Sequence, residues 1–114
     1  MATECLFCKI VAGQLPATVV YRDDRVVAIR DIHPVAPTHI LLMPVRHLGS
    51  MAEAGSGDGD LIGMLHLSAA KVAAQEGLKD GYRLVINTGR DGGQTVGHLH
   101  VHLLGGRRMH WPPG

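Results

Sequence analysis

The chain has 114 residues, a formal net charge of +1 and an apolar content of 46%. This length suits one domain with one core, which we expect over residues 1–114. The near-zero charge excludes the electrostatic surface of a nucleic-acid or membrane-surface binder, and no apolar run is long enough to span a bilayer. The N-terminal residues Met1-Ala2-Thr3-Glu4 lack the basic and apolar regions of a signal peptide, so we expect a cytoplasmic protein.

The strand predictions rest on short apolar runs. Residues 19–21 and 26–30 are β-rich, and the polar segment 22–25 joins them as a hairpin. Residues 39–44 form an apolar run bounded by prolines and predict another strand. An alternating strand is also predicted at residues 82–87. Several antiparallel strands with one long helix predict an α+β domain.

The one long helix is predicted to run towards Gly77, with Asp58 or Asp60 as its N-terminal cap. Its apolar residues lie nearly all round the helix, so both sides of it need to be covered. Two interpretations remain open. A partner subunit covers one side, or the helix has a wide core face and exposes some alanine.

The histidine run at residues 98–104 carries the strongest functional signal. His98, His100 and His102 alternate with aliphatic residues, so on a strand the three imidazoles share one face. Imidazole acts as base, nucleophile or metal ligand near neutral pH. Two chemistries compete: a pair of these histidines ligates zinc, or one attacks phosphorus while its neighbours position the phosphate.

A glycine-rich loop at residues 88–95 leads into the histidine run. Gly92 and Gly93 allow the backbone to approach a ligand closely. The N–H groups of Gly93, Gln94 and Thr95 are predicted to form a nest for an anion, and the Thr95 hydroxyl adds a donor. A simple hairpin loop is the alternative. The position beside the imidazoles favours phosphoryl or nucleotidyl transfer.

Cys5 and Cys8 form a Cys-x-x-Cys pair. In a cytosolic chain such a pair indicates redox chemistry or metal binding, and the βαβ context of the redox version is absent. Two cysteines supply only half of a zinc site, so two histidines are also needed. A reduced, metal-free pair is the alternative.

Over nearly its whole length the chain resembles the histidine triad (HIT) family. The histidine run, the tail and several shorter matches carry the resemblance: Pro37-Thr38-His39, Asn87, Asp91-Gly92-Gly93-Gln94-Thr95 and residues 105–114. The Trp-Pro-Pro-Gly ending favours the histidine triad nucleotide-binding branch, the purine nucleoside phosphoramidases. The resemblance implies a HIT-like fold: an antiparallel sheet of about five strands with one long helix and a short N-terminal helix, the sheet extending across a homodimer.

The resemblance also implies a mechanism. His100 attacks the α-phosphorus of a purine nucleoside 5′-phosphoramidate and expels the amine, and water then cleaves the nucleotidyl-histidine. His102 hydrogen-bonds the phosphate, and His39 lies behind it as an orienting group. The implied nucleotide ligands are Asp31 with Ile32 at the ribose, and Asn87, Gly93, Gln94 and Thr95 at the phosphate, together with His100 and His102. Phe7, Ile10 and Ile32 line a base pocket or belong to the core.

For the cysteines, the resemblance implies one structural zinc ion per subunit, and catalysis requires no cofactor. The implied ligands are Cys5, Cys8, His47 and His98. Trp111 and its prolines are implied to reach the partner subunit's site. Two positions depart from the family pattern: Thr95 replaces a common serine, and Gly97 replaces a usual aromatic residue, which puts leaving-group preference in question.

Three other functions stay open at this point. One is a dinucleoside polyphosphate hydrolase. Another is a nucleotide-binding interaction protein whose catalysis is incidental. The last is a zinc hydrolase that uses the histidine run as an open metal site.

Overall fold

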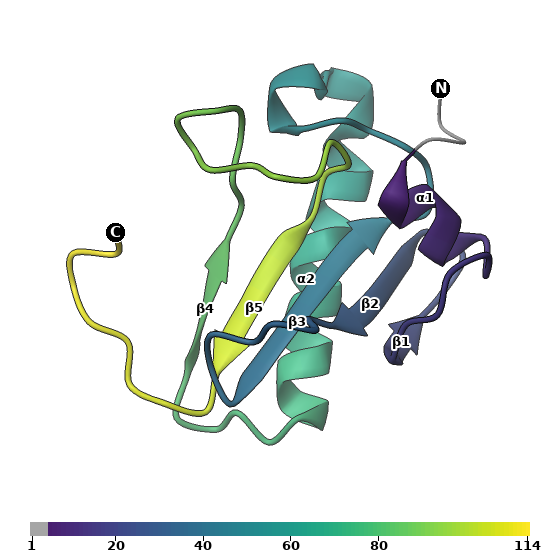
Figure 1. Ribbon diagram of the computed structural model, residues 1–114. Coiled ribbons are helices and arrows are strands. Elements are labelled where there is room, and N and C mark those ends of the chain that lie inside the picture. Colours follow the sequence, from purple (N-terminus) through teal and green to yellow (C-terminus); the bar gives the residue numbers. More distant parts are fainter. Residues whose placement is uncertain (1–4) are drawn as a thin grey trace.

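The structure, a computed structural model, describes residues 5–114, so the signal-peptide expectation on residues 1–4 lies outside it. Five strands form one antiparallel sheet in the order β1-β2-β3-β5-β4, with a long helix on one face and a short helix on the other (Figure 1). The predicted α+β class, with an antiparallel sheet of five strands, one long helix and a short N-terminal helix, is confirmed. The elements are α1 (Leu6–Val11), β1 (Val19–Arg22), β2 (Val26–Arg30), β3 (Thr38–Pro44), the 3-10 turns Met51–Glu53 and Ser56–Asp58, α2 (Gly59–Gln75), β4 (Tyr82–Val85) and β5 (Val101–Gly105).

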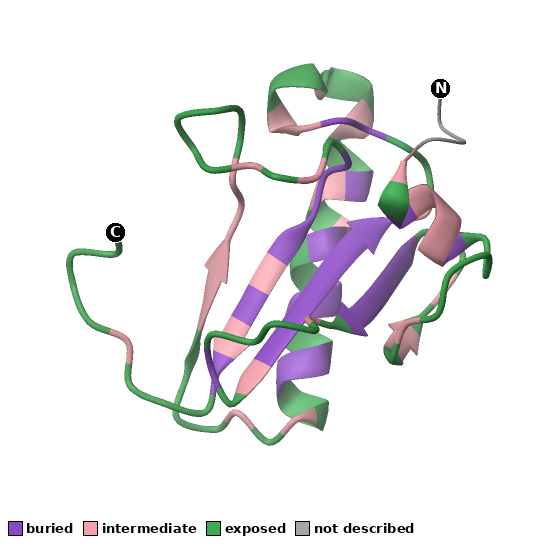
Figure 2. Cartoon of the chain, viewed as in Figure 1, coloured by how far each residue is buried: buried purple, intermediate pink, exposed green. Residues whose placement is uncertain are grey.

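The strands alternate between two apolar clusters, one on each face of the sheet. On the α2 face, β2 and β3 contribute Val26, Ala28, Ile40 and Leu42. On the α1 face they contribute Val27, Ile29, Leu41 and Met43, which pack with Phe7 and Val11. Because both faces are covered, β2 and β3 are apolar and buried along most of their length (Figure 2).

Helix α2 buries one wide face and leaves apolar residues outside it. The buried residues are Leu61, Leu65, Ser68, Ala69, Val72 and Ala73. Leu67 is 67% exposed, and Ile62 and Met64 are half-buried. The helix therefore has one wide core face, and the apolar side chain of Leu67 remains exposed outside it. No helix among residues 5–114 is long and apolar enough to cross a membrane.

The ends of α2 differ from prediction at one side only. Gly77 has a φ of 74°, a left-handed conformation that favours glycine just beyond a helix. Asp58 stands at the N-cap, but its side chain makes no capping hydrogen bond. Its carboxylate instead accepts the Gly55 N–H at 2.8 Å and pairs with Arg46. The predicted position of the cap is therefore confirmed, but its carboxylate is taken up by these two partners and caps no N–H of the helix.

A regular strand covers only the second part of the histidine run. β5 begins at Val101, where its ladder with β3 ends. Upstream the chain bends, and the Leu99 N–H donates to the Leu48 carbonyl at 2.6 Å. The strand predicted over the whole run is therefore wrong for residues 98–100. The predicted sidedness is confirmed, since Leu99, Val101 and Leu103 all lie in the cluster under α2.

Candidate functional site

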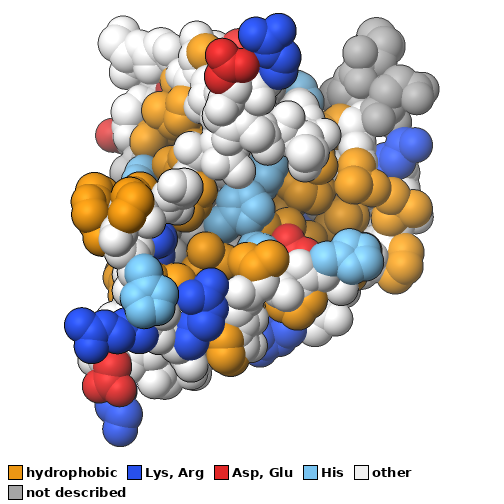
Figure 3. Space-filling model, turned by 60° about the vertical axis from the view of Figure 1, so that its left-hand side comes forward, with side chains coloured by type: hydrophobic (Ala, Val, Ile, Leu, Met, Phe, Trp, Pro, Cys, Tyr) orange, Lys and Arg blue, Asp and Glu red, His pale blue; other side chains and the backbone are white. Residues whose placement is uncertain are grey.

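The three alternating histidines lie in different surroundings. His98 and His100 are buried, with 0% and 6% of their surface exposed, whereas His102 is half-buried. Figure 3 shows histidine side chains in a hollow of the surface, with hydrophobic side chains on both sides. The polar partners of the rings also differ. His98 faces two cysteines and His47, whereas His102 faces His39.

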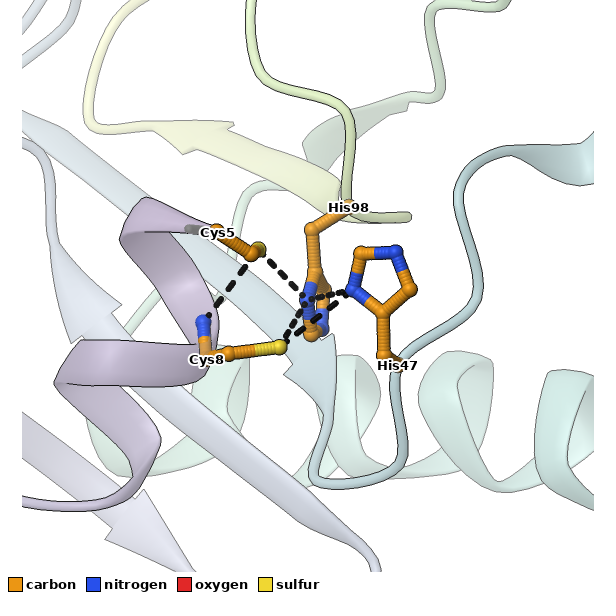
Figure 4. Close-up of side chains that lie close together, drawn as sticks. All are labelled: Cys5, Cys8, His47 and His98. Carbon is orange, nitrogen blue, oxygen red and sulfur yellow. Dashed lines mark hydrogen bonds between the residues drawn. The ribbon is translucent and has the colours of Figure 1, made fainter. Parts of the chain in front are cut away.

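Four side chains from three segments converge beside α1, and we call them the cysteine–histidine cluster (Figure 4). Cys5 is the N-cap of α1 and Cys8 follows one turn later, while His47 follows β3 and His98 precedes β5. Nδ1 of His98 lies 3.3 Å from Sγ of Cys5, 3.5 Å from Sγ of Cys8 and 3.2 Å from Nδ1 of His47. The structure thus brings together all four residues that the sequence proposed as zinc ligands.

The cysteine–histidine cluster fits a tetrahedral metal ion. Zinc–sulfur bonds of about 2.3 Å and zinc–nitrogen bonds of about 2.0–2.1 Å place neighbouring ligand atoms roughly 3.3–3.8 Å apart. Nε2 of His98 lies 2.9 Å from the Pro44 carbonyl, which only accepts hydrogen bonds. The neutral His98 ring therefore carries its proton on Nε2 and its lone pair on Nδ1, which faces the thiols. Two sulfur and two nitrogen ligands form a donor set that suits zinc.

The pKa values in this cluster describe its metal-free form. Burial lowers the pKa of His98, which keeps the ring neutral and ready to ligate. Burial, with the neighbouring Cys5 thiol, raises the pKa of Cys8 to about 11. Cys8 is therefore a thiol at neutral pH, and a metal ion must displace its proton. Metal binding is accordingly expected to weaken as the pH falls.

The ring of His100 has one tautomer fixed by the backbone. Its Nδ1 lies 2.7 Å from the carbonyl oxygen of His98, so the proton is on Nδ1. Nε2 of the neutral ring then carries the lone pair. The edge of the Phe7 ring packs against His100, with the centroids 5.0 Å apart and the planes at 89°. Orientation and tautomer of His100 are thus both set by neighbours.

His102 belongs to a second hydrogen-bonded group with His39. Nδ1 of His39 accepts the N–H of Val35 at 3.1 Å, which leaves the His39 proton on Nε2. That Nε2 lies 2.9 Å from Nδ1 of His102 and 3.4 Å from Oδ2 of Asp31. His39 therefore donates to His102. As a consequence, neutral His102 carries its own proton on Nε2 and presents an N–H donor.

Both rings stay neutral at a lower pH than an ordinary histidine, because their pKa values are lowered. Burial lowers the pKa of His39, and burial followed by the nearby His100 and His39 rings lowers the pKa of His102 to about 4. Unfolded histidine titrates near its ordinary value of 6.5. Between these two values the unfolded chain binds more protons than the folded chain, so stability rises with pH there and is constant above it.

We expect this titration to be visible in thermal melts of the metal-free protein. From about pH 7 to about pH 4.5 the Tm of the wild type is expected to fall by roughly 5–10 °C more than that of a His102→Gln variant, since a shift of one pKa unit is worth about 1.4 kcal/mol at most. Metal-free protein is used so that loss of zinc ligands does not contribute. Parallel profiles for the two proteins would contradict the assignment.

The loop at residues 88–95 is closed by its own backbone. The N–H of Gly93 donates to the Arg90 carbonyl at 3.1 Å, and the N–H of Gln94 donates to the Gly89 carbonyl at 3.0 Å. The predicted anion nest is wrong for these two donors, because tight turns already use them. Within residues 5–114, the N–H and hydroxyl of Thr95 make no hydrogen bond, so both remain available to a ligand.

The Gln94 side chain braces this loop. Its Nε2 donates to the carbonyls of Gly49 and Val96 at 2.7 and 2.9 Å, and its Oε1 accepts the N–H of Gly89 at 3.1 Å. Gly97 lies three residues after Gln94, and a Cβ added there would meet open space. It lines a cavity of about 560 Å³, so the missing aromatic side chain leaves room beside the loop.

The expected ribose ligands lie next to His39. Asp31 directly follows β2, and its Oδ1 accepts the N–H of His33 at 2.7 Å. Ile32 is 85% exposed, so its side chain is free to cover a ligand. Phe7 is 4% exposed and lies beneath the imidazoles, so of its two predicted places it takes the core. Asn87 is half-buried just beyond β4.

The remaining histidines take no part in these groups. His33, His66 and His110 are exposed and lie outside both of them. Nδ1 of His66 lies 2.8 Å from the Ile62 carbonyl of its own helix. Trp111 is 83% exposed within the single chain.

Backbone groups are the part of the site that sequence reasoning missed. The N–H of Val35 and the carbonyls of Pro44 and His98 set the tautomers of His39, His98 and His100. Every residue offers a carbonyl, so only the path of the chain reveals which one is used.

Comparisons with known proteins agree with this fold and site. Residues 12–109 match the HIT domain family. The chain is 53% identical over 111 residues to a 14 kDa zinc-binding protein of Zea mays, covering 96% of this chain and 87% of that one. A HIT family hydrolase from Legionella pneumophila Philadelphia 1 is 50% identical, with a TM-score of 0.95 over 96% of this chain and 99% of that one. A zinc-bound histidine triad family protein from Mycobacterium smegmatis is 31% identical, with a TM-score of 0.79 over 94% and 78% of the two chains.

The chain therefore belongs to the HIT domain family. Its fold is that of HIT family hydrolases, and its cysteine–histidine cluster agrees with the zinc-binding members among its relatives.

Proposed function

We propose that this protein hydrolyses the phosphorus–nitrogen bond of purine nucleoside 5′-phosphoramidates through a nucleotidyl-histidine intermediate. The observation that carries the proposal is the hydrogen bond of 2.7 Å from Nδ1 of His100 to the His98 carbonyl. It leaves Nε2 of a neutral, oriented imidazole free to act as nucleophile. The Trp-Pro-Pro-Gly ending supports the histidine triad nucleotide-binding branch, with the whole chain, residues 1–114, as one domain.

In the first step, Nε2 of His100 donates its lone pair to the α-phosphorus. The phosphorus–nitrogen bond breaks, and its electron pair leaves on nitrogen, which takes up one proton and departs as an amine. The Nε2–H of His102 hydrogen-bonds the phosphate as negative charge builds up on it. His39 is a positioning residue, because it acts through its hydrogen bond of 2.9 Å to His102.

In the second step, water attacks the phosphorus and loses a proton. The bond from phosphorus to Nε2 breaks, its electron pair returns to His100, and the nucleoside monophosphate is released. Overall, the hydroxyl of water adds to phosphorus and its proton goes to the amine, so His100 is regenerated.

The phosphate oxygens are held by Asn87 and Thr95 in this proposal. Thr95 contributes its N–H and its hydroxyl, which have no partner among residues 5–114. Gly93 and Gln94 contribute by presenting Thr95, because their own N–H groups close the loop.

The nucleoside is held at the end of β2. The Asp31 carboxylate accepts hydrogen bonds from the two ribose hydroxyls, for which it keeps free lone pairs beside its bond to the His33 N–H. The exposed Ile32 covers the purine base. Hydrogen bonds to the ribose select a nucleoside phosphoramidate over a phosphoramidate that carries no nucleoside.

Zinc has a structural role in this proposal, with one ion per subunit bound to Cys5, Cys8, His47 and His98. Four protein ligands fill a tetrahedral site and leave no open position for substrate. The alternative of a metal in the second group, with His39 and His102, is less well supported. Their nitrogens are 2.9 Å apart, which suits a hydrogen bond better than the roughly 3.3 Å between two nitrogens on one tetrahedral ion.

We further propose a cytoplasmic homodimer without nucleic-acid or membrane partners. β4 is an edge strand, and its Tyr82 is 41% exposed, while Leu67 of α2 is 67% exposed. Pairing two β4 edges extends the sheet across the dimer and covers these side chains. Trp111 then reaches the partner subunit's site. A single-chain mass in light scattering would contradict the dimer.

The activity is tested by comparing two substrates. We expect kcat/KM for adenosine 5′-phosphoramidate to exceed that for diadenosine tetraphosphate by at least about tenfold, since the site is arranged for one nucleotidyl group. Protein denatured at alkaline pH, where a phosphorus–nitrogen bond to histidine survives, should carry one AMP on the peptide containing His100 by mass spectrometry. The opposite preference would favour a dinucleoside polyphosphate hydrolase. AMP binding with negligible turnover of every phosphoramidate would favour a nucleotide-binding interaction protein.

A further inference from the structure

We propose that the cysteine–histidine cluster positions the nucleophile, so that metal occupancy there controls the rate of attack on phosphorus. This inference rests on the proposed function for the role of His100. It goes beyond a structural zinc site, because it links the metal to one catalytic group. Two contacts of the His100 ring carry it, and both come from segments that the cluster holds.

The first contact is the carbonyl of His98, which accepts the hydrogen bond from His100. Residues 98–100 lie beyond the end of the β3–β5 ladder, so the sheet does not hold them. They are held by the N–H of Leu99 on the Leu48 carbonyl, by the buried side chain of Leu99 under α2 and, on the other face, by the side chain of His98. One ring nitrogen of His98 is fixed on Pro44, and the other faces the two thiols and His47. A metal ion in the cluster therefore fixes the residue whose carbonyl orients the nucleophile.

The second contact is the ring of Phe7, which lies between the two cysteines in the sequence. Its centroid is 6.0 Å from that of His98 and 5.0 Å from that of His100, both edge-on. α1 has only six residues, far fewer than an isolated helix needs for stability. Its placement therefore depends on its buried side chains and on Cys5 and Cys8. Binding of metal by these thiols fixes the wall against which His100 packs.

Two of the proposed nucleotide ligands come from other segments. Asp31 directly follows β2 and Asn87 lies beyond β4, and neither segment carries a cluster ligand. Thr95 stands three residues before His98, but the Gln94 side chain holds its loop through Gly49, Gly89 and Val96. We therefore expect loss of the metal to slow the chemical step much more than it weakens nucleotide binding.

The test compares the zinc-loaded wild type with Cys8→Ser, a ligand for which the structure gives no hydrogen bond to His100. Val72→Ala is the matched control, since it removes buried volume under α2 on the opposite face of the sheet. In single-turnover experiments we expect Cys8→Ser to slow nucleotidylation of His100 at least about tenfold, because a misplacement of about 1 Å can cost up to about 100-fold. Its Kd for AMP should change by less than about threefold. Added zinc should restore the nucleotidylation rate of the metal-stripped wild type but not that of Cys8→Ser.

A second readout does not depend on turnover. Long-range proton–nitrogen NMR spectra report the tautomer of His100 directly, and we expect a single Nδ1–H form with zinc and a mixture in Cys8→Ser. An unchanged nucleotidylation rate, or the same single tautomer in both proteins, would overturn the inference. So would a rate loss of the same size in Val72→Ala. If the wild type hydrolyses no phosphoramidate, the proposed function fails, while the spectra still decide the coupling.

Discussion

Replacing His100 by alanine is expected to lower turnover of adenosine 5′-phosphoramidate by roughly 10⁴-fold or more, while AMP still binds. The variant removes the nitrogen whose lone pair attacks phosphorus, and no covalent intermediate can then form on this residue. The proposed ligands of the phosphate, Asn87 and Thr95, and of the ribose, Asp31, stay in place. Amine release measures the turnover, and isothermal titration calorimetry measures the affinity for AMP.

The fold of this variant is expected to survive. His100 is 6% exposed, so its removal leaves a cavity and takes away one backbone hydrogen bond worth about 1 kcal/mol net, but it removes no metal ligand. His66→Ala is a suitable control, since this exposed histidine of α2 contacts only the Ile62 carbonyl of its own helix. It should keep wild-type turnover. Undiminished turnover in His100→Ala would remove the role assigned to His100.

Replacing His98 by alanine is expected to cost stability before it costs anything else. The ring is 0% exposed, so its removal leaves a cavity, and the Pro44 carbonyl loses its donor. The metal ligand on Nδ1 is lost as well. Cavity formation and an unpaired buried acceptor together amount to about 3–5 kcal/mol. For a domain of this size we expect the Tm to fall by roughly 10–20 °C.

His47→Ala separates the two causes of this loss. His47 is exposed, so its removal takes one ligand from the cysteine–histidine cluster but leaves the core intact. Its Tm should fall less than that of His98→Ala, and it should equal the Tm of the wild type stripped of metal by a chelator. Zinc content by atomic absorption accompanies each melt. If the metal-free wild type had the same Tm as His98→Ala, loss of the metal alone would explain the loss of stability, and the buried ring of His98 would add nothing.

Periodicity predicted most of the fold because burial in this chain follows the two faces of one sheet. β2 and β3 read as apolar runs since both faces are covered, and Leu99, Val101 and Leu103 of the histidine run lie under α2. The Cys-x-x-Cys pair predicted a metal site because its spacing fits one turn of α1.

The misses share one physical cause. The late start of β5, the closed loop at residues 88–95 and the missing capping hydrogen bond of Asp58 all depend on which backbone donor meets which acceptor. The partners are backbone groups of Leu48, Arg90 and Gly55. The side chains of these residues do not indicate which donor or acceptor the backbone will meet. Sequence patterns rank residue types, whereas such pairings follow from the path of the whole chain.

The backbone contacts that set the tautomers of His39, His98 and His100 have a consequence for protein engineering. A design that transfers only the imidazole side chains onto another sheet would lack the backbone amide and carbonyls that determine which ring nitrogen carries each proton. The transferable unit is the bent approach to β5 together with the turn at Val35. Grafts that keep those two stretches of main chain should outperform grafts that match side-chain positions alone.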